Sequence, residues 1–122
     1  MNNAILNQYG ITFQKQSNGN IKTHATSKNL DNFMYMFCRN INRLQRFVAI
    51  VNQVLNNGYN SISEHDKNWD VEIGFQVYTG LIYSNTEFDL YFEEEENETF
   101  PLNDIKEIFE SLLEFINSEA KL

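Results

Sequence analysis

The sequence predicts an α+β fold in which an antiparallel sheet carries two helices packed on one face, in the order β-β-α-β-β-α. Two segments, near residues 10–24 and 71–93, alternate apolar and polar residues as strands do. Each is followed by a segment with helical periodicity, residues 30–55 and 103–116. With 122 residues, the chain is expected to form a single domain over residues 1–122.

The first alternating segment reads as a β-hairpin. Ile11 and Phe13 alternate with polar residues up to residue 15, and Asn18-Gly19 in the next four residues tolerates positive φ. A return strand over residues 21–24 completes the predicted hairpin.

The next segment predicts one long helix that ends at Asn57-Gly58. Its apolar positions step alternately by four and three: Leu30, Met34, Phe37, Ile41, Leu44, Val48, Val51 and Leu55. Arg39, Arg43 and Arg46 fall almost opposite this stripe. Because the chain as a whole is acidic, we interpret them as a solvated face or as partners of nearby carboxylates rather than as a nucleic-acid site.

Residues 59–70 are polar and aperiodic and are expected to form a loop. One half-buried strand should follow, with inward residues Val71, Ile73, Phe75 and Val77. A second strand should pair with it through inward residues Phe88, Leu90 and Phe92. The turn lies near Thr79-Gly80 or Ser84-Asn85, and whether residues 81–83 continue the first strand stays open. The last helix is expected to begin at the N-cap Asn103.

This alternation predicts an acidic and aromatic face on the side of the sheet away from the helices. Its expected members are Glu72, Tyr78, Glu87, Asp89, Tyr91 and Glu93, and the acidic run that follows adds Glu94, Glu95, Glu96 and Glu98. Carboxylates on alternate strand residues are about 7 Å apart, comparable to the phosphate spacing of a nucleic-acid strand. If a second subunit covers this face, the acidic surface would instead be residues 94–98 and the last helix, where Glu107, Glu110 and Glu114 share one side.

The net charge of −8 is distributed unevenly along the chain. Residues 1–60 hold six Lys and Arg against one Asp, a balance of +5, whereas residues 61–122 hold three Lys against sixteen Asp and Glu, a balance of −13. Such a field repels nucleic acid from the C-terminal half and attracts cationic partners.

Catalytic chemistry is not expected, because the residue types that it needs are sparse. The sequence Glu64-His65-Asp66 suggests metal ligands, but no HExxH or other i, i+4 pair supports them. Cys38 adjoins the apolar stripe and predicts a buried thiol. GxGxxG, Walker-type and GxSxG motifs are absent from the sequence. We therefore expect no enzyme, no cofactor and no metal site.

A cytosolic location is expected from the same sequence. A single cysteine cannot form an internal disulfide, which suits a reducing compartment. The N-terminal residues lack the basic and apolar regions of a signal peptide, and no apolar run approaches the length of a membrane span.

The C-terminal part, FDLYFEEE from Phe88 and FPLNDIKEIFESLLEFI from Phe100 to Ile116, resembles the tail of small bacterial immunity proteins. These include the immunity proteins of contact-dependent growth inhibition and related polymorphic toxin systems. The resemblance covers about a quarter of the chain. It implies a cytosolic, non-catalytic antitoxin that neutralises one cognate toxin domain, often a nuclease. The acidic charge of the chain predicts that this toxin domain is a basic protein.

Two other functions stay open. A small acidic secretion chaperone, which holds an unfolded effector segment and usually dimerises, fits the size and a pI near 4.6. A phage-encoded inhibitor of a host defence nuclease would use the same nucleic-acid mimicry. In each reading the partner is a protein, not nucleic acid or a membrane, and the choice between monomer and homodimer stays open.

Overall fold

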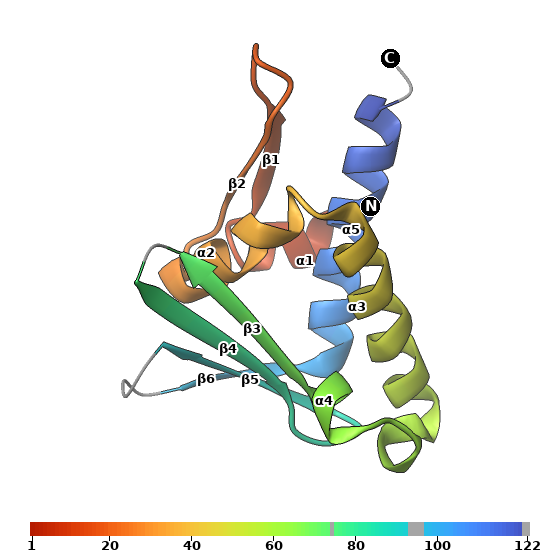
Figure 1. Ribbon diagram of the computed structural model, residues 1–122. Helices are drawn as coiled ribbons and strands as arrows, with labels where there is room; N and C mark the ends of the chain where they lie inside the picture. The colour runs from red at the N-terminus through yellow and green to blue at the C-terminus, as the bar shows by residue number, and fades with distance from the viewer. Residues whose placement is uncertain (74, 93–96, 121–122) are drawn as a thin grey trace.

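The computed structural model describes residues 1–73, 75–92 and 97–120 (Figure 1). The helices are α1 (Asn3–Gln8), α2 (Lys28–Phe37), α3 (Ile41–Gln53), α4 (Glu64–Lys67) and α5 (Leu102–Ala120), with a π-helical turn at Val54–Gly58 and a 3₁₀ turn at Tyr59–Ser61. The strands are β1 (Thr12–Lys15), β2 (Ile21–His24), β3 (Asn68–Ile73), β4 (Gln76–Ile82), β5 (Glu87–Phe92) and β6 (Glu98–Pro101).

The α+β class is confirmed, but the predicted order β-β-α-β-β-α is wrong. The strands β1 and β2 form a two-stranded antiparallel sheet of their own. A second antiparallel sheet has the order β3-β4-β5-β6, so the second half of the chain supplies twice the expected number of strands. Figure 1 shows α2, α3 and α5 on one side of this four-stranded sheet.

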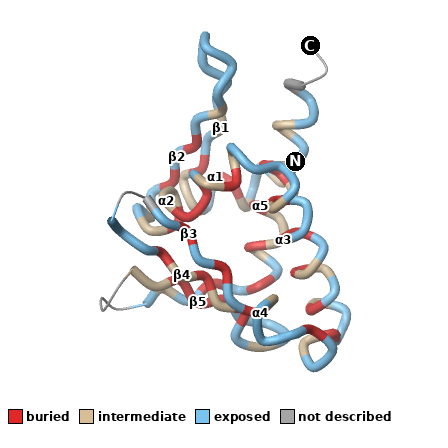
Figure 2. The backbone as a smooth tube through the Cα atoms, viewed as in Figure 1, coloured by how far each residue is buried: buried red, intermediate tan, exposed pale blue. Residues whose placement is uncertain are grey.

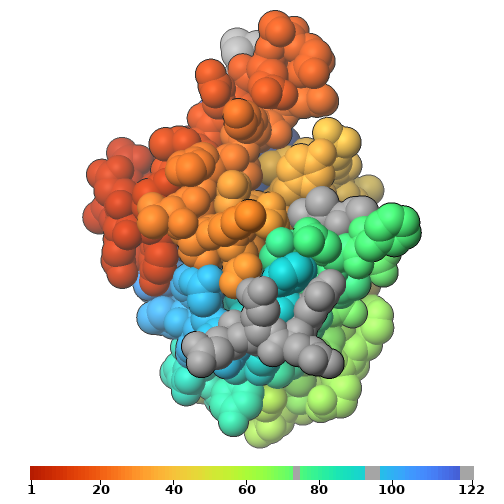
Figure 3. All heavy atoms as spheres, turned by 90° about the vertical axis from the view of Figure 1, so that its left-hand side faces the viewer, coloured from red at the N-terminus to blue at the C-terminus, as the bar shows by residue number. Residues whose placement is uncertain are grey.

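The first hairpin is confirmed. Thr12 pairs with His24 and Lys15 with Ile21, and Gly19 takes the positive φ of +89° in the connecting turn. The hairpin projects away from the rest of the molecule (Figures 1 and 3).

The single long helix predicted over residues 30–55 is wrong, because the chain breaks between α2 and α3. The side chain of Asn40 accepts a hydrogen bond from the backbone N–H of Arg43 and so begins a new helix. The apolar stripe continues across this break because both helices pack their apolar residues against the same core. Phe37 of α2 and Leu44 of α3 are both fully buried there. Ile41, at the start of α3, lies outside this core.

The predicted strand over residues 71–78 is also wrong, because these residues belong to two strands. Ile73 pairs with Gln76 and Val71 with Tyr78, so the chain reverses between residues 73 and 76. A reversal of this length exchanges the faces to which odd and even residues point. Tyr78, expected to face solvent, is therefore buried in the core with 3% of its surface exposed, whereas Phe75, expected in the core, is fully exposed.

The core is built around an aromatic cluster. The ring of Phe33 on α2 lies 5.3 to 6.0 Å from the rings of Phe37, Phe47, Phe88 and Phe109, which come from α2, α3, β5 and α5. Gly80 on β4 makes room for it, because a Cβ atom there would meet ring atoms of Phe88 and Phe33 at 2.5 and 2.6 Å. Along β3, buried residues alternate with exposed ones, as expected for a strand with one face against this core (Figure 2).

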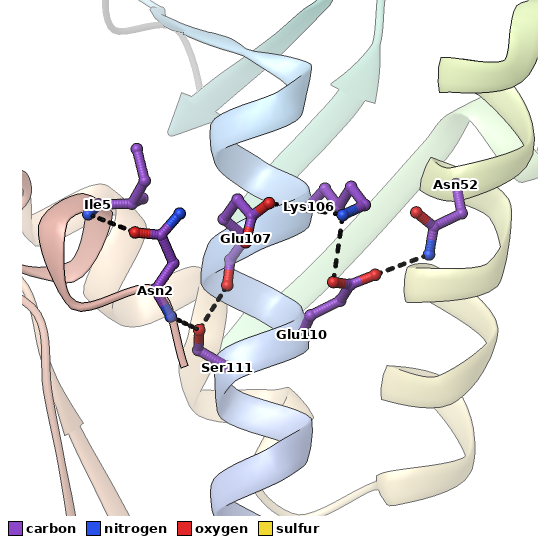
Figure 4. Close-up of polar contacts among 7 residues, drawn as sticks. All are labelled: Asn2, Ile5, Asn52, Lys106, Glu107, Glu110 and Ser111. Atoms are coloured by element: carbon purple, nitrogen blue, oxygen red, sulfur yellow. Dashed lines mark hydrogen bonds and ion pairs between the residues drawn. The ribbon is translucent and has the colours of Figure 1, made fainter.

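Polar contacts hold α5 between α1 and α3 (Figure 4). The backbone N–H of Asn2 donates to the Ser111 hydroxyl at 3.4 Å, and the Asn52 amide donates to Glu110 at 2.9 Å. Lys106 lies 3.3 Å from Glu110 and 3.5 Å from Glu107. The acidic side of α5 is the alternative binding surface predicted from the sequence. On this side, Glu107 and Glu110 already have partners within the fold.

A tyrosine joins the end of α1 to the first turn of α5. The hydroxyl of Tyr9 donates to the Asp104 carboxylate at 2.5 Å. Burial, together with the Asp104 hydrogen bond and charge, raises the pKa of Tyr9 to about 12. The folded state therefore binds the phenol proton more tightly than the unfolded state does.

This hydrogen bond predicts a loss of stability in alkali. The contribution of Tyr9 is complete below pH 10, the ordinary tyrosine pKa, and is lost as the pH rises through the window between 10 and about 12. Urea unfolding of the wild type and of Tyr9→Phe at pH 8 and pH 11.5 measures it. The wild type should lose more stability over this interval than the variant, and equal losses would contradict the assignment.

Candidate partner-binding surface

The four-stranded sheet has one face that α2, α3 and α5 cover and one that they leave open (Figure 1). We call the open side the outer face. Strand pairing places on it Asn68, Asp70, Glu72, Val77, Thr79, Leu81, Glu87, Asp89, Tyr91, Thr99 and Pro101, and Tyr83 directly after β4 continues the alternation.

Among the described residues, four carboxylates share the outer face, and three of them are solvent-exposed. Asp70 and Glu72 come from β3, and Glu87 comes from β5, on opposite sides of the central strand β4. The sequence prediction is confirmed for the placement of Glu72 and Glu87. The acidic and aromatic character expected of this face is therefore present, with a changed membership.

Asp89 differs from the other three because it is buried, with 7% of its surface exposed. Its carboxylate accepts hydrogen bonds from the Thr99 hydroxyl at 2.6 Å and from the Tyr91 hydroxyl at 3.3 Å. Burial and the Asp89 charge raise the pKa of Tyr91, and Tyr83 contributes a smaller effect. Asp89 therefore positions Tyr91 rather than presenting a free charge to a partner.

Two predicted members lie elsewhere. Tyr78 belongs to the helix-covered face, where it stacks on Phe92 at 4.7 Å and receives a hydrogen bond from Asn32 at 2.7 Å. Glu98 also lies toward the helices and accepts hydrogen bonds from Ser27 at 2.8 Å and Asn29 at 3.1 Å, at the start of α2. Glu93, Glu94, Glu95 and Glu96 lie outside the described residues.

Sequence reasoning missed Asp70 and Tyr83 as members of the outer face. Asp70 was assigned to a loop, and Tyr83 to a segment whose strand character was open. A predicted reversal between residues 73 and 76 would have placed both, because the residues on either side then pair as two strands with exchanged faces.

The three arginines do not form one free basic stripe. Arg39 lies in the break between α2 and α3, 4.9 Å from the ring of Tyr35. Arg46 forms an ion pair with Asp66 at 2.5 Å, which confirms the expectation of carboxylate partners for this residue. Arg43 lies over the rings of Phe37 and Trp69, at 5.7 and 5.6 Å, and donates to the backbone carbonyl of Asp70 at 2.6 Å.

These contacts predict that Arg43 contributes to stability through its planar group. Arg43→Ala should lower the free energy of unfolding by about 1–2 kcal/mol, because it removes two cation-π contacts and leaves the Asp70 carbonyl without this donor. Urea titration measures the change. Arg39→Ala is the comparison at an exposed site, where it removes one cation-π contact with Tyr35, and it should cost only about 0.5 kcal/mol. Equal losses in the two variants would contradict the role of Arg43.

The segment Glu64-His65-Asp66 lines a groove of about 630 Å³ together with Arg43, Arg46, Asn68, Trp69 and Asp70. Its acidic side chains already have partners. The Arg46 hydrogen bond lowers the pKa of Asp66, and Glu64 binds Lys67 at 2.8 Å. His65 is largely exposed. Across the residues that the structure describes, no three His, Cys, Asp or Glu side chains are placed to hold a metal ion.

Cys38 is partly buried at the end of α2, and its thiol lies 3.5 Å from the carbonyl oxygen of Met34. Burial raises the pKa of Cys38 to about 11. The thiolate is therefore scarce near neutral pH, which suits a packing role rather than a nucleophilic one.

Comparison with known proteins returned no significant match to a family model, a curated protein or a solved structure. Among the described helices, none has both the length and the apolar character to cross a membrane.

Proposed function

We propose that this protein is an immunity protein that neutralises a basic bacterial toxin domain by binding it through the outer face of the sheet. The observation that carries the proposal is a sheet face left open by the helices, with Asp70, Glu72 and Glu87 exposed on it and Tyr83 and Tyr91 on the same face. Exposed carboxylates and tyrosines on one surface favour a cationic protein partner.

The charge of the chain supports a fast and salt-dependent association. A net charge of −8, concentrated in the half of the sequence that forms the four-stranded sheet, attracts a cationic toxin over a distance of about one Debye length. A nuclease toxin fits this partner class, because its substrate groove must be basic to bind phosphates. The resemblance of the C-terminal part to immunity proteins points the same way.

A second candidate is an acidic secretion chaperone. The outer positions of β4 favour it, because Val77 and Leu81 are apolar and a chaperone needs apolar surface for an unfolded segment. The two candidates differ in the partner, which is a folded toxic domain in one case and an unfolded effector segment in the other.

A growth experiment tests the proposal. The immobilised wild type is used to isolate its partner from cells of its source, and the partner is then expressed alone in a neutral host. We expect the partner to arrest growth, co-expression of the wild type to restore it, and Glu72→Lys or Glu87→Lys to restore it less well.

The matched control is Glu114→Lys on α5, which makes the same charge change at an exposed glutamate away from the sheet. This variant should rescue growth as the wild type does. A harmless partner that binds only when unfolded would favour the chaperone, and equal rescue by all three variants would exclude the outer face as the inhibitory surface.

A further inference from the structure

The central strand β4 carries apolar residues on both of its faces, which is unusual for a sheet with one open side. Tyr78, Gly80 and Ile82 face the helices and are buried. Val77 and Leu81 point to the outer face, where antiparallel sheets normally carry polar residues. Strands that are apolar on both faces are typical of sheets covered on both sides.

The outer positions of β4 form a continuous stripe. Val77, Thr79, Leu81 and Tyr83 follow one another at every second residue, about 7 Å apart. Val77 is 36% exposed and Tyr83 is 57% exposed. We call these four residues the β4 stripe.

Acidic side chains flank the β4 stripe on both sides. Glu72 on β3 is directly opposite Val77, and Asp70 is opposite Thr79. On β5, Glu87 lies near the Tyr83 end, where the Tyr83 N–H donates to the Glu87 carbonyl at 3.0 Å. An apolar centre with a charged rim is the usual anatomy of a protein interface.

The edge of β3 is less suited to a partner than the outer face. A partner that adds a strand to β3 needs the outward carbonyl of Asp70, which already accepts a hydrogen bond from Arg43. On the β4 stripe, Val77 and Tyr83 are exposed and Thr79 and Leu81 are partly exposed, so the partner is expected to pack on the face rather than pair with the edge of β3. Helices can cover a sheet face in this way, as α2, α3 and α5 do on the opposite face of this sheet (Figure 1).

We infer that the β4 stripe is the docking site of a basic amphipathic helix of the partner, with apolar residues against the stripe and Lys or Arg beside Asp70, Glu72 and Glu87. The inference rests on the proposed function and names the structural element of the toxin, a helix, that the outer face binds. Strand β4, Gln76–Ile82, is about 20 Å long and matches a helix of roughly four turns.

Phe75 lies in the turn directly before β4, two residues from Val77 at one end of the β4 stripe. Its side chain is fully exposed, at 104% of the reference surface, which is exceptional for phenylalanine. The segment that begins β4, green in Figure 3, stands out from the surrounding surface. Aromatic side chains in such positions are frequent anchors of protein interfaces.

A peptide binding experiment tests the inference. The probe is a fluorescent 18-residue peptide of Leu and Lys whose leucines fall on one helical stripe, and the reference is a peptide of the same composition in scrambled order. Fluorescence anisotropy should give a dissociation constant about tenfold lower for the ordered peptide. Val77→Ser/Leu81→Ser should weaken its binding about tenfold.

Two controls separate loss of the site from loss of the fold. Tyr35→Ser removes an exposed aromatic residue on α2 and should leave peptide binding within about twofold. If the double variant does not fold, Val77→Ser alone replaces it. Equal binding of the two peptides, or unchanged binding by the folded stripe variant, would overturn the inference.

Binding of the natural partner, measured alongside the peptides, distinguishes failure of this inference from failure of the proposed function. If the ordered peptide does not bind preferentially but Glu72→Lys still weakens binding of the natural partner, only the helical docking mode is overturned. If Glu72→Lys and Glu87→Lys leave the natural partner bound as before, the outer face itself is excluded.

Discussion

Replacing Phe33 with alanine should lower the free energy of unfolding by about 3–5 kcal/mol. Phe33 is fully buried at the centre of the aromatic cluster, with the rings of four other phenylalanines within 6.0 Å. The substitution removes its apolar surface from the core and leaves a cavity that α2, β5 and α5 can fill only in part. A loss of this size is a large fraction of the stability of a domain.

Phe75→Ala is the matched control, because it makes the same chemical change at a fully exposed phenylalanine. It should change the free energy of unfolding by less than about 0.5 kcal/mol. Urea unfolding followed by Trp69 fluorescence measures both variants, since Trp69 is buried and lies 5.0 Å from Phe47 in the same cluster. Similar losses in the two variants would show that the aromatic cluster is not the centre of the core.

Charge reversal on the outer face should have the second large effect, on the rate of partner binding. Glu72→Lys and Glu87→Lys should each slow association about fivefold to tenfold at low ionic strength, because each replaces an attractive charge with a repulsive one. The difference from the wild type should shrink as salt is added. Stopped-flow mixing with the isolated partner at two salt concentrations measures these rates.

Glu114→Lys again provides the control. It changes the net charge by the same amount on α5, where Glu114 lies 3.2 Å from the N-terminal amine. If association depends only on net charge, all three variants will slow equally. If the outer face is the binding surface, the two sheet variants will slow association much more than the α5 variant does.

Asp89 is unsuitable for such a charge reversal, although the sequence pattern places it on the same face as Glu72 and Glu87. Its carboxylate is buried and holds Thr99 and Tyr91 by hydrogen bonds. A lysine there would replace the buried carboxylate with a buried positive charge, and the hydroxyls of Thr99 and Tyr91 would lose their acceptor. Loss of binding by Asp89→Lys would therefore report a change of fold rather than of charge.

Local patterns predicted those parts of the fold that local physics determines. The alternation and the Asn-Gly turn of residues 12–24 specify a hairpin, since a two-stranded ladder and its turn depend on neighbouring residues. The apolar stripe of residues 30–55 correctly marks the core-facing helical residues, such as Leu30 and Val51. It could not show the break at Asn40, because two helices packed on the same core continue the same periodicity.

Correct prediction of the candidate site depended on one turn that the alternation of apolar and polar residues does not reveal. Alternation continues from Val71 through Tyr78, and a hairpin reversal between residues 73 and 76 preserves the apolar and polar spacing while exchanging the faces. Glu72 and Glu87 were placed correctly because each belongs to a strand whose own alternation is uninterrupted. Tyr78 was placed wrongly because it lies beyond the reversal.

The sequence pattern could not predict the pairing of β6 with β5 either. Glu98 pairs with Leu90 and lies on the face toward α2, where Ser27 and Asn29 bind it. An acidic residue after an acidic run reads as solvated surface, and only the tertiary structure supplies its hydrogen-bond donors.

The most direct test of the outer face as the binding surface is an NMR titration of the labelled protein with its isolated partner. We expect the largest chemical-shift changes at backbone amides of residues 76–83 and 87–91, on β4 and β5. Changes confined to the β1–β2 hairpin and α3, with β4 and β5 unaffected, would contradict it.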